Sequence, residues 1–508
     1  MGRLQPSYKK AIFDEFVYSI SSNNSHYYGF VSNEQDSSNT VIPKDIYSSN
    51  FDFTWNMIFG KKLKETDLIP IIKKNFWNSN TIYDKYDNTD ENLIIRDNFY
   101  VITEPQEGGG YYHVYVCIDN FGNSSSTVRP ESVQIDSFVT LPDNYQWKYI
   151  TSISTQTYNK FATNEYFPIH PNTAISQSAS IDSGVNKIVV NNGGAGYVEY
   201  TSGVIQSNPS STLVQIANNS SITTGFYNNT TIRIFNTTGA PQIRTISNYI
   251  SNNSGKWVSV DIPLNTALIT SNSTLYYISP KVVVRTDGTA NPLAVSVVNT
   301  SSNSISSIEI YDIGANISWA EATIQSNYGS GANLYCIVPP PGGFGLDPAI
   351  ELDMKGYCIA FDFDGTEGNT IIYSIDYNKI GLIKNPAVIT AAGNKGSNIY
   401  SSNTFSSLLS ANVSYTFIPG DTLTGTLTGA VGKVVFANST TVFLSGDKYF
   451  SNGEPVSTKS INDVANNINI TSRGNIYNKD LTPLYIQNIS EVTRGENQKE
   501  SFKIIIKL

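Results

Sequence analysis

The run Gly356–Phe363 (GYCIAFDF) constrains the fold of this chain most. Its apolar and aromatic residues are those that form strands of a half-buried sheet. A loop with the sequence PPPGGFG precedes the run, and Asp364-Gly365 follows it as a turn signal. We therefore predict a strand over Tyr357–Phe363, opened by Gly356, and a return strand over Ile371–Ile375. A further segment, Tyr377–Ile383, ends at Asn385-Pro386. The residue before a proline is pushed away from helical backbone angles, so no helix is expected to continue through this pair. The stretch has the character of a structural core rather than an active site.

The composition indicates a mainly β protein. Only 15% of the 508 residues are charged, whereas Tyr, Ile, Val and Thr recur in short runs between clusters of Asn, Ser and Gly. The first group favours strands and the second favours turns. The length corresponds to about three domains, so we predict a mainly β, multidomain fold with all-β insertions.

Charge and cysteine content exclude several classes of function. The net charge is −9 and no basic patch is present, so we expect no nucleic-acid partner. No apolar run approaches the length that spans a bilayer and the N-terminus lacks the apolar block of a signal peptide, so we expect no membrane insertion and assembly in a cytoplasm-like compartment. Cys117, Cys336 and Cys358 are odd in number and widely spaced, which favours buried free thiols over a disulfide framework.

Residues 1–170 are predicted to form the first part of a protein body. We predict strands over Phe13–Ile20 and Tyr27–Val31, and a helical or irregular segment over Asn50–Gly60 that stops at Gly60. In Lys61–Trp77, Pro70 excludes a long helix.

An acidic link, Thr81–Asp90, leads into a second group of predicted strands. Asn98–Thr103 and Tyr111–Asp119 form a strand pair across a Gly-rich loop, and Leu141–Ser154 adds another strand. In Tyr111–Asp119, alternation places His113, Tyr115 and Cys117 on one face.

Residues 171–338 form a predicted Ser/Asn-rich, all-β insertion of small modules. Lys187–Asn208 resembles Ser307–Asn327, because each has an alternating strand, a Gly turn and an aromatic-containing return that ends in IQSN. Two copies are too few for a repeat array. Four more strand-like runs lie between them: Thr230–Phe235, Trp257–Ile262, Leu275–Ile278 and Lys281–Arg285.

The remaining chain is predicted as a central body segment (339–390), a second β-module insertion (391–480) and a C-terminal strand segment that returns to the body (481–508). Within the second insertion, Gly420–Val456 has the pattern of a compact meander. In the last segment, Phe502, Ile504, Ile506 and Leu508 alternate onto one face.

Two acidic clusters are candidate cation sites. The cluster after the central strand is too short for the helical calcium-loop signature and lacks its later bidentate Glu, so a hairpin turn is our interpretation. The cluster in the acidic link is interpreted as a polar loop. The residues are Asp362, Asp364, Gly365 and Glu367 in the first cluster, and Asp84, Asp87, Asp90 and Glu91 in the second.

Other candidates for chemistry are sparse. His113 and Cys117 share a strand face, but a structural zinc needs about four ligands. With only His26, His113 and His170 in the chain, a Ser-His-Asp mechanism has few possible bases. The turn at Gly193–Gly196 does not open a helix, so we interpret it as a strand-to-strand turn rather than a phosphate cradle. No local motif favours paired glycosidase carboxylates, and we predict no catalytic, cofactor or metal residues.

Several separated segments, taken in order, resemble the baseplate wedge proteins of T4-type contractile-tailed bacteriophages. They cover somewhat under half of the chain, and the stretch HYYGFVSNEQ departs from the family pattern in lacking Gly-Arg and Trp. The segments are Lys61–Trp77 with TIYDKYD after it, NFYVIT and YYHVYVCIDN (98–120), LPDNYQWKYITSIS and ATNEYFPI (141–169), Pro339–Pro386, and the C-terminal PLYIQNI with ENQKESFKIIIKL.

The resemblance implies a structural role without enzymatic activity. It implies sandwich-like β-domains with a few short helices, a homodimer, contacts with other baseplate wedge subunits, and a place in the tail baseplate of the virion. The alternatives are a tail-associated adhesin, whose insertions bind host glycans through Tyr and Asn, and a polysaccharide-degrading tail spike. Tyr is spread along the whole chain, which favours packing over sugar binding, and the long coil repeat of tail spikes is missing from the sequence.

Overall fold

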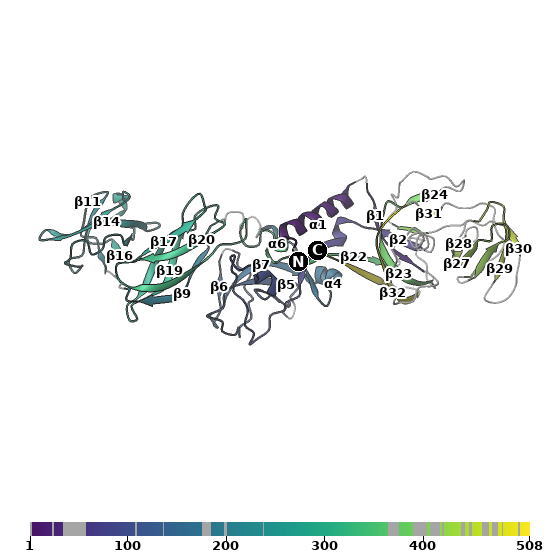
Figure 1. The fold of residues 1–508 in the computed structure, drawn as a ribbon, viewed down its shortest axis with the longest axis horizontal. Coiled ribbons are helices and arrows are strands. Elements are labelled where there is room, and N and C mark those ends of the chain that lie inside the picture. The colour runs from purple at the N-terminus through teal and green to yellow at the C-terminus, as the bar shows by residue number, and fades with distance from the viewer. Residues whose placement is uncertain are drawn as a thin grey trace. The chain divides into compact units, whose positions relative to one another are not determined.

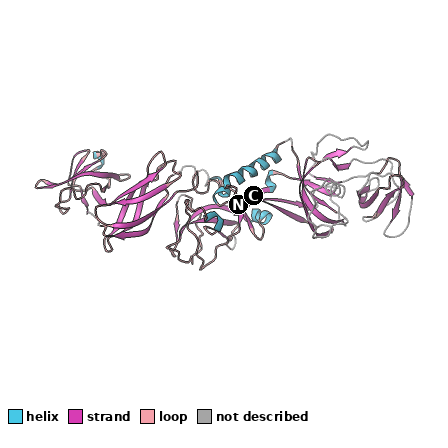
Figure 2. Cartoon of the chain, viewed as in Figure 1, coloured by secondary structure: helices cyan, strands magenta, loops and turns pink. Residues whose placement is uncertain are grey.

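The computed structural model describes most of the chain as antiparallel sheets with few helices (Figure 2), which confirms the mainly β prediction. It divides into two compact units: unit 1 is Met1–Ile71 with Met354–Leu508, and unit 2 is Ile72–Asp353. The described residues are 3–22, 25–33, 57–106, 109–135, 137–174, 184–197, 201–236, 238–363, 375–389, 404–406, 417–418, 421–437, 442–446, 450–459, 467–469, 476–479, 481–495 and 498–508.

Unit 1 combines elements from both ends of the chain (Figure 1). They are α1 (Pro6–Ser21), β1 (Tyr27–Ser32), β2 (Met57–Lys62), the 3-10 helix η1 (Glu65–Asp67), β3 (Leu68–Lys73), β22 (Gly356–Phe363), β23 (Ile375–Lys384), β24 (Ala387–Ile389), β25 (Thr404–Ser406), β26 (Thr422–Gly425), β27 (Val431–Ala437), β28 (Val442–Gly446), β29 (Pro455–Lys459), β30 (Asn467–Asn469), β31 (Ile476–Lys479), β32 (Thr482–Arg494) and β33 (Glu500–Lys507).

Two sheets of unit 1 pack face to face as a β-sandwich. One has the strand order β25-β2-β1-β23-β32, and in the other β22 lies between β33 and β3. A Cβ atom on Gly29 in β1 would lie 2.4 Å from the ring of Phe361 in β22, so the small residue makes room for the aromatic one. Beside it, the rings of Phe59 and Phe363 meet edge to face at 4.5 Å. The predicted strand Tyr357–Phe363 is therefore confirmed and, as part of β22, lies between two other strands.

The N-terminal segment is a helix, so the predicted strand over Phe13–Ile20 is wrong. Pro6 occupies the first turn of α1, where its missing N–H costs nothing. The aromatic ring of Phe13 packs on Tyr357 of β22 at 5.5 Å, and Phe16 contacts the same ring at 5.6 Å. The buried Lys9 donates from Nζ to the Met354 carbonyl at 3.0 Å. Tertiary packing of one face thus determines the helix in a run of strand-forming residues.

Two further predictions near the sandwich are corrected. Asn50–Gly60 was predicted to be helical or irregular; its residues from Met57 onward belong to β2, where Gly60 pairs with Phe30 instead of ending the segment. The return strand Ile371–Ile375 falls largely outside the described residues. Ile375 itself opens β23, which pairs with β1 and β32 rather than with β22.

The second insertion forms a small sheet of its own with the order β28-β27-β26-β29-β30. The first three strands are consecutive antiparallel neighbours, as the predicted meander requires, but β29 then returns to the opposite side of β26. The core of this sheet includes Leu423, Val434 and Val456. Strands β24 and β31 form a separate pair, and β25 pairs with β2.

Unit 2 contains one continuous part of the chain (Figure 1). Its elements are α3 (Leu93–Arg96), β4 (Tyr100–Thr103), β5 (Tyr111–Asp119), β6 (Val139–Thr140), β7 (Gln146–Ser154), α4 (Thr155–Phe161), β8 (Tyr166–Pro168), β9 (Lys187–Ala195), β10 (Thr201–Val204), β11 (Ser207–Ser210), β12 (Leu213–Ile216), β13 (Thr231–Ile234), β14 (Gln242–Asn252), β15 (Gly255–Val260), the 3-10 helix η2 (Thr266–Leu268), β16 (Leu275–Ser279), β17 (Lys281–Thr286), β18 (Leu293–Asn299), β19 (Ser304–Asp312), β20 (Ala320–Gln325), β21 (Ser330–Ile337) and α6 (Pro348–Glu351).

The first sheet of unit 2 has the order β4-β5-β7-β6. The predicted pairing of Asn98–Thr103 with Tyr111–Asp119 is confirmed as β4 and β5, and the strand in Leu141–Ser154 is β7. Trp147 is fully buried at the centre, with the rings of Tyr145 and Tyr83 each 5.5 Å away. Aromatic packing of this kind gives the sheet a rigid core.

Every strand described between residues 187 and 337 pairs only with strands of the same segment. The sheets are β10-β16-β13-β14-β15-β12-β11, β19-β18-β17-β20 and β21-β9. The four predicted runs from Thr230 to Arg285 correspond to β13, β15, β16 and β17. The two similar segments are not hairpins, however: β9 pairs with β21 rather than β10, and β19 pairs with β18 rather than β20. Their similarity is one of sequence and not of strand pairing.

The unit boundaries fall inside two of the predicted segments, 1–170 and 339–390, and the segments themselves stay a prediction. Among the described residues, no helix is both long and apolar enough to cross a membrane.

Candidate functional site

The acidic link converges on an arginine rather than on a metal site. Arg96, the last residue of α3, donates from Nε to Asp84 at 2.7 Å and from Nη2 to Asp90 at 2.6 Å. The Arg96 hydrogen bond holds the pKa of Asp90 below its usual range. Asp87 instead accepts from the backbone and hydroxyl of Thr89, and Glu91 is exposed. The guanidinium thus supplies the positive charge that a cation would have supplied.

His113 and Cys117 have separate partners. Nδ1 of His113 lies 2.7 Å from the hydroxyl of Ser152, and burial together with Arg129 lowers the pKa of His113. Cys117 lies in the core with Trp147, where burial raises the pKa of its thiol well above the ordinary value. A thiol that stays protonated is a poor nucleophile and a poor metal ligand.

The described residues hold no group of three or more His, Cys, Asp or Glu side chains able to bind a metal ion. Of the acidic cluster that we interpreted as a hairpin turn, only Asp362 is described; Asp364, Gly365 and Glu367 lie outside the described residues. All three cysteines are buried, as predicted.

The glycines at 193–196 bring strands together rather than cradle a phosphate. Gly193 and Gly194 are part of β9, so the predicted strand-to-strand turn is only partly right. A Cβ atom on Gly193 would lie 2.4 Å from the Ile305 carbonyl oxygen, and one on Gly194 would lie 2.4 Å from that of Ser330. Gly194 also has φ +63°, which favours glycine. The close backbone contacts at positions 193 and 194 therefore require glycine.

Tyrosines of the 171–338 segment mainly pack. Tyr197, Tyr227, Tyr249 and Tyr276 are all buried, three of them in one apolar cluster. The hydroxyl of Tyr249 donates to the carbonyl of Ser221, as expected for buried phenols that keep a polar partner. Among the described tyrosines of this segment, the hypothesis of sugar stacking is left with the exposed Tyr311 and Tyr328.

Two exposed aliphatic residues lie in loops whose backbone is hydrogen-bonded to buried side chains. Ile222 is 85% exposed, and the adjacent Ser221 bonds to the hydroxyls of Tyr227 and Tyr249. Leu427 is 74% exposed, and its N–H donates to the buried Glu454 at 2.9 Å. Each turn is thus fixed by a buried polar group while it presents an apolar side chain. Preorganised apolar contacts of this kind suit a protein neighbour, because little entropy is lost on binding.

A buried carboxylate that the sequence analysis did not single out holds the Gly-rich loop before α6. Glu351 accepts the N–H of Gly345 at 2.8 and 2.9 Å and that of Asp347 at 3.0 Å. Burial raises the pKa of Glu351 to about 7, against the opposite effect of these N–H groups. The signal in the sequence is Asp347-Pro348 followed by Glu351, since Asp347 also caps α6.

Glu351 predicts a pH-dependent stability of unit 2. The pKa of Glu351 is about 7 in the folded protein, above the ordinary 4.5. Its contribution to the free energy of unfolding is therefore complete below pH 4.5 and is lost as the pH rises to about 7. We expect the free energy of unfolding to fall more steeply over this range in the wild type than in Glu351→Gln. Urea unfolding followed by tryptophan fluorescence measures it. Glu321→Gln, at an exposed site of β20, serves as the control and should retain the wild-type slope; equal slopes for wild type and Glu351→Gln would contradict the assignment.

Comparison with known proteins identifies no relative: neither a protein-family model nor a curated protein matches the chain.

Proposed function

We propose that this chain is a structural subunit of the baseplate wedge in a contractile phage tail. It acts through protein–protein interfaces during baseplate assembly and in the rearrangement that accompanies tail contraction, and it makes or breaks no bond. Its partners are a second copy of the chain and other wedge subunits. Its location is the tail baseplate of the virion, assembled in the cytoplasm of the host.

One observation carries the proposal: segments that carry the family resemblance and lie far apart in the sequence form one sheet. In unit 1, Ile69 of β3 pairs with Cys358 of β22, and Cys358 also pairs with Ile505 of β33. These residues come from Lys61–Trp77, Pro339–Pro386 and the C-terminal segment. The low-charge segment between residues 187 and 337 pairs only within itself. This pattern supports a common body to which other β-modules have been added.

The packing of the sheets also suits a subunit that moves as a rigid element. Close-packed aromatic cores transmit force without deforming, and contraction would exchange one set of interfaces for another. The exposed Ile222 and Leu427 are candidates for contacts with neighbours. By contrast, the burial of Tyr227, Tyr249 and Tyr276 gives the adhesin alternative little support.

Fractionation of phage particles tests the proposal. Particles disrupted into heads, tails and isolated baseplates are probed with an antibody against the purified full-length chain. We expect the chain to copurify with tails and baseplates and to be missing from tail-free heads. Its recovery only from the soluble, unassembled fraction of the infected cell would contradict the proposal. A glycan array with the same full-length protein tests the adhesin alternative, which a specific hit would favour.

A further inference from the structure

A single residue separates two β-modules inside unit 2. The seven-stranded module (201–279) ends with β16 at Ser279, and the four-stranded sheet (281–325) begins with β17 at Lys281, so that Pro280 is the direct link between them at this end of the module. The Pro280 carbonyl accepts a bond from Ser296 of β18 at 2.7 Å. Because proline fixes φ at this position, the link itself leaves few backbone angles free, and the side-chain contacts across it matter for the orientation of the module.

Arg233 of the seven-stranded module reaches the four-stranded sheet. Its guanidinium forms an ion pair with Glu309 of β19 and donates to the hydroxyl of Tyr311, which itself donates to Glu309 at 2.8 Å. The same group lies 4.7 Å from the ring centre of Phe235, 5.3 Å from that of Tyr277 and 5.8 Å from that of Tyr311. Its side chain is only 11% exposed. One cation is thus held by an anion and three aromatic rings, two of the rings from its own module.

Arg233 contributes to the contact with the four-stranded sheet but not to the core of its own module. Arg233 lies on the face of β13 opposite the module's core, which is made by Ile232 and Ile234. Its loss therefore leaves the packing of the module in place. A second ring contact joins Phe226 of the module to Tyr328 in the loop after the four-stranded sheet at 5.1 Å and is apolar. The hydroxyl of Tyr277 also accepts the N–H of Val298 of β18 at 3.5 Å. The ionic and the apolar contact can thus be removed separately.

We propose that Arg233 is a lock that holds the seven-stranded module in one orientation on the four-stranded sheet. With the lock closed, the two parts move as one rigid arm. Without it, the module samples several orientations while its own fold is retained. The proposal concerns the internal mechanics of unit 2 and does not depend on the function proposed above.

Distance measurement between spin labels tests the lock. Labels are attached at Asn248→Cys and Ser307→Cys, which are exposed on β14 and β19, while the three native cysteines are buried. We expect one narrow distance distribution in the otherwise unchanged full-length protein. Arg233→Ala should broaden it, with about a tenfold rise in the ratio of released to locked molecules, the change expected when a partly buried ion pair with cation–π contacts is lost.

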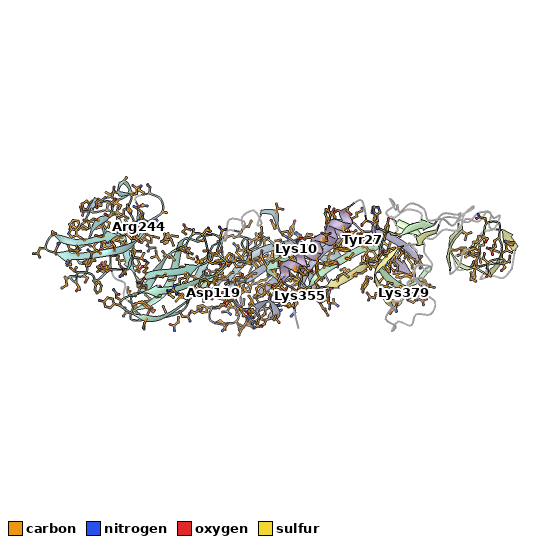
Figure 3. The ribbon with its side chains drawn as sticks, turned by 45° about the horizontal axis from the view of Figure 1, so that its top comes forward. Lys10, Tyr27, Asp119, Arg244, Lys355 and Lys379 are labelled. Carbon is orange, nitrogen blue, oxygen red and sulfur yellow. The ribbon has the colours of Figure 1, made fainter. Side chains whose placement is uncertain are left out.

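Two variants make the result decisive. Arg244→Ala is the matched control, because Arg244 (Figure 3) bonds only to Ile243, Ile262 and Pro263 of its own module among the contacts that the structure describes, and it should leave the distribution narrow. Glu309→Gln keeps the aromatic contacts, lies at an exposed position and should broaden the distribution to a smaller degree. An unchanged distribution in Arg233→Ala would overturn the proposal and assign the orientation to the remaining contacts of the module, those of Phe226 and Tyr277. Should Arg233→Ala fail to fold, an unchanged Glu309→Gln would overturn it.

Discussion

Replacing Glu500 with Gln is expected to lower the free energy of unfolding of unit 1 by about 3–5 kcal/mol, the usual cost of leaving one charge of a buried pair uncompensated. Arg494 at the end of β32 donates from Nε to both carboxylate oxygens of Glu500 at 2.9 and 3.0 Å. The two side chains are only 4% and 7% exposed. Since β32 and β33 belong to different sheets of the sandwich, the pair joins the two sheets where the chain passes between them. Hydrogen exchange in increasing urea, followed in peptides of β22 and β33, measures the loss for this unit alone.

The control for this prediction lies on β32, the strand that carries Arg494. Glu491→Gln removes an exposed carboxylate of β32 and should change stability by no more than about 0.5 kcal/mol. The double variant Arg494→Met/Glu500→Leu should recover much of the lost stability, because it removes both charges together. A Glu500→Gln variant as stable as Glu491→Gln would show that the pair is not buried as described.

Gly356→Ala is expected to weaken unit 1 by about 3 kcal/mol, since it combines a steric clash with a strained backbone. A Cβ atom at this position would lie 1.9 Å from the carbonyl oxygen of Ile506, and Gly356 has φ +152°. The clash is with backbone, so no side-chain rotation relieves it. The start of β22 must move away from β33, and the amides of both strands should exchange faster by the same amount in free energy.

Gly453→Ala separates the two causes. Gly453 also has a positive φ, +75°, but no atom lies within 4 Å of the Cβ that an alanine would add. It should therefore cost only about 1 kcal/mol, the conformational part. If Gly356→Ala proved no more costly than Gly453→Ala, β22 and β33 could not lie as close as the structure has them.

The strands of this protein could be predicted largely from local pattern, whereas their partners could not. Tyr357–Phe363 and Tyr111–Asp119 are strand-forming whatever surrounds them, and both predictions are confirmed. The assignment of Ile375 depended on a turn signal nearby, and the actual partners of β23 come from β1 and from β32, more than a hundred residues away. Register and neighbours are set by the buried face of the whole sheet and not by the nearest turn.

The helix α1 was predicted as a strand because two signals in its sequence conflict. Phe13, Phe16 and Ile20 recur at spacings of three and four, which is a helical signal. Their aromatic and β-branched character favoured a strand, and the contact of Phe13 with Tyr357 decides the outcome. The amphipathic spacing was therefore the better guide in this segment.

The candidate sites were limited in a similar way. The sequence places Asp84 and Asp90 near each other, but only the turn of α3 brings Arg96 between them. Arg233 and Glu309 are likewise 76 residues apart, so no local motif could reveal their contact. The role of Glu351 could have been found from the sequence more readily, because its hydrogen-bond partners lie within six residues of it.

A cryo-electron microscopy map of the contractile tail tests the central claim most directly. The account predicts that density for this chain lies in the baseplate, with the sandwich of unit 1 intact, and that each copy buries more than about 2,000 Å² against its neighbours, as permanent assemblies do. A complete baseplate map from the same particle with no density for this chain, or a chain bound there by small contacts of less than about 800 Å² alone, would contradict it.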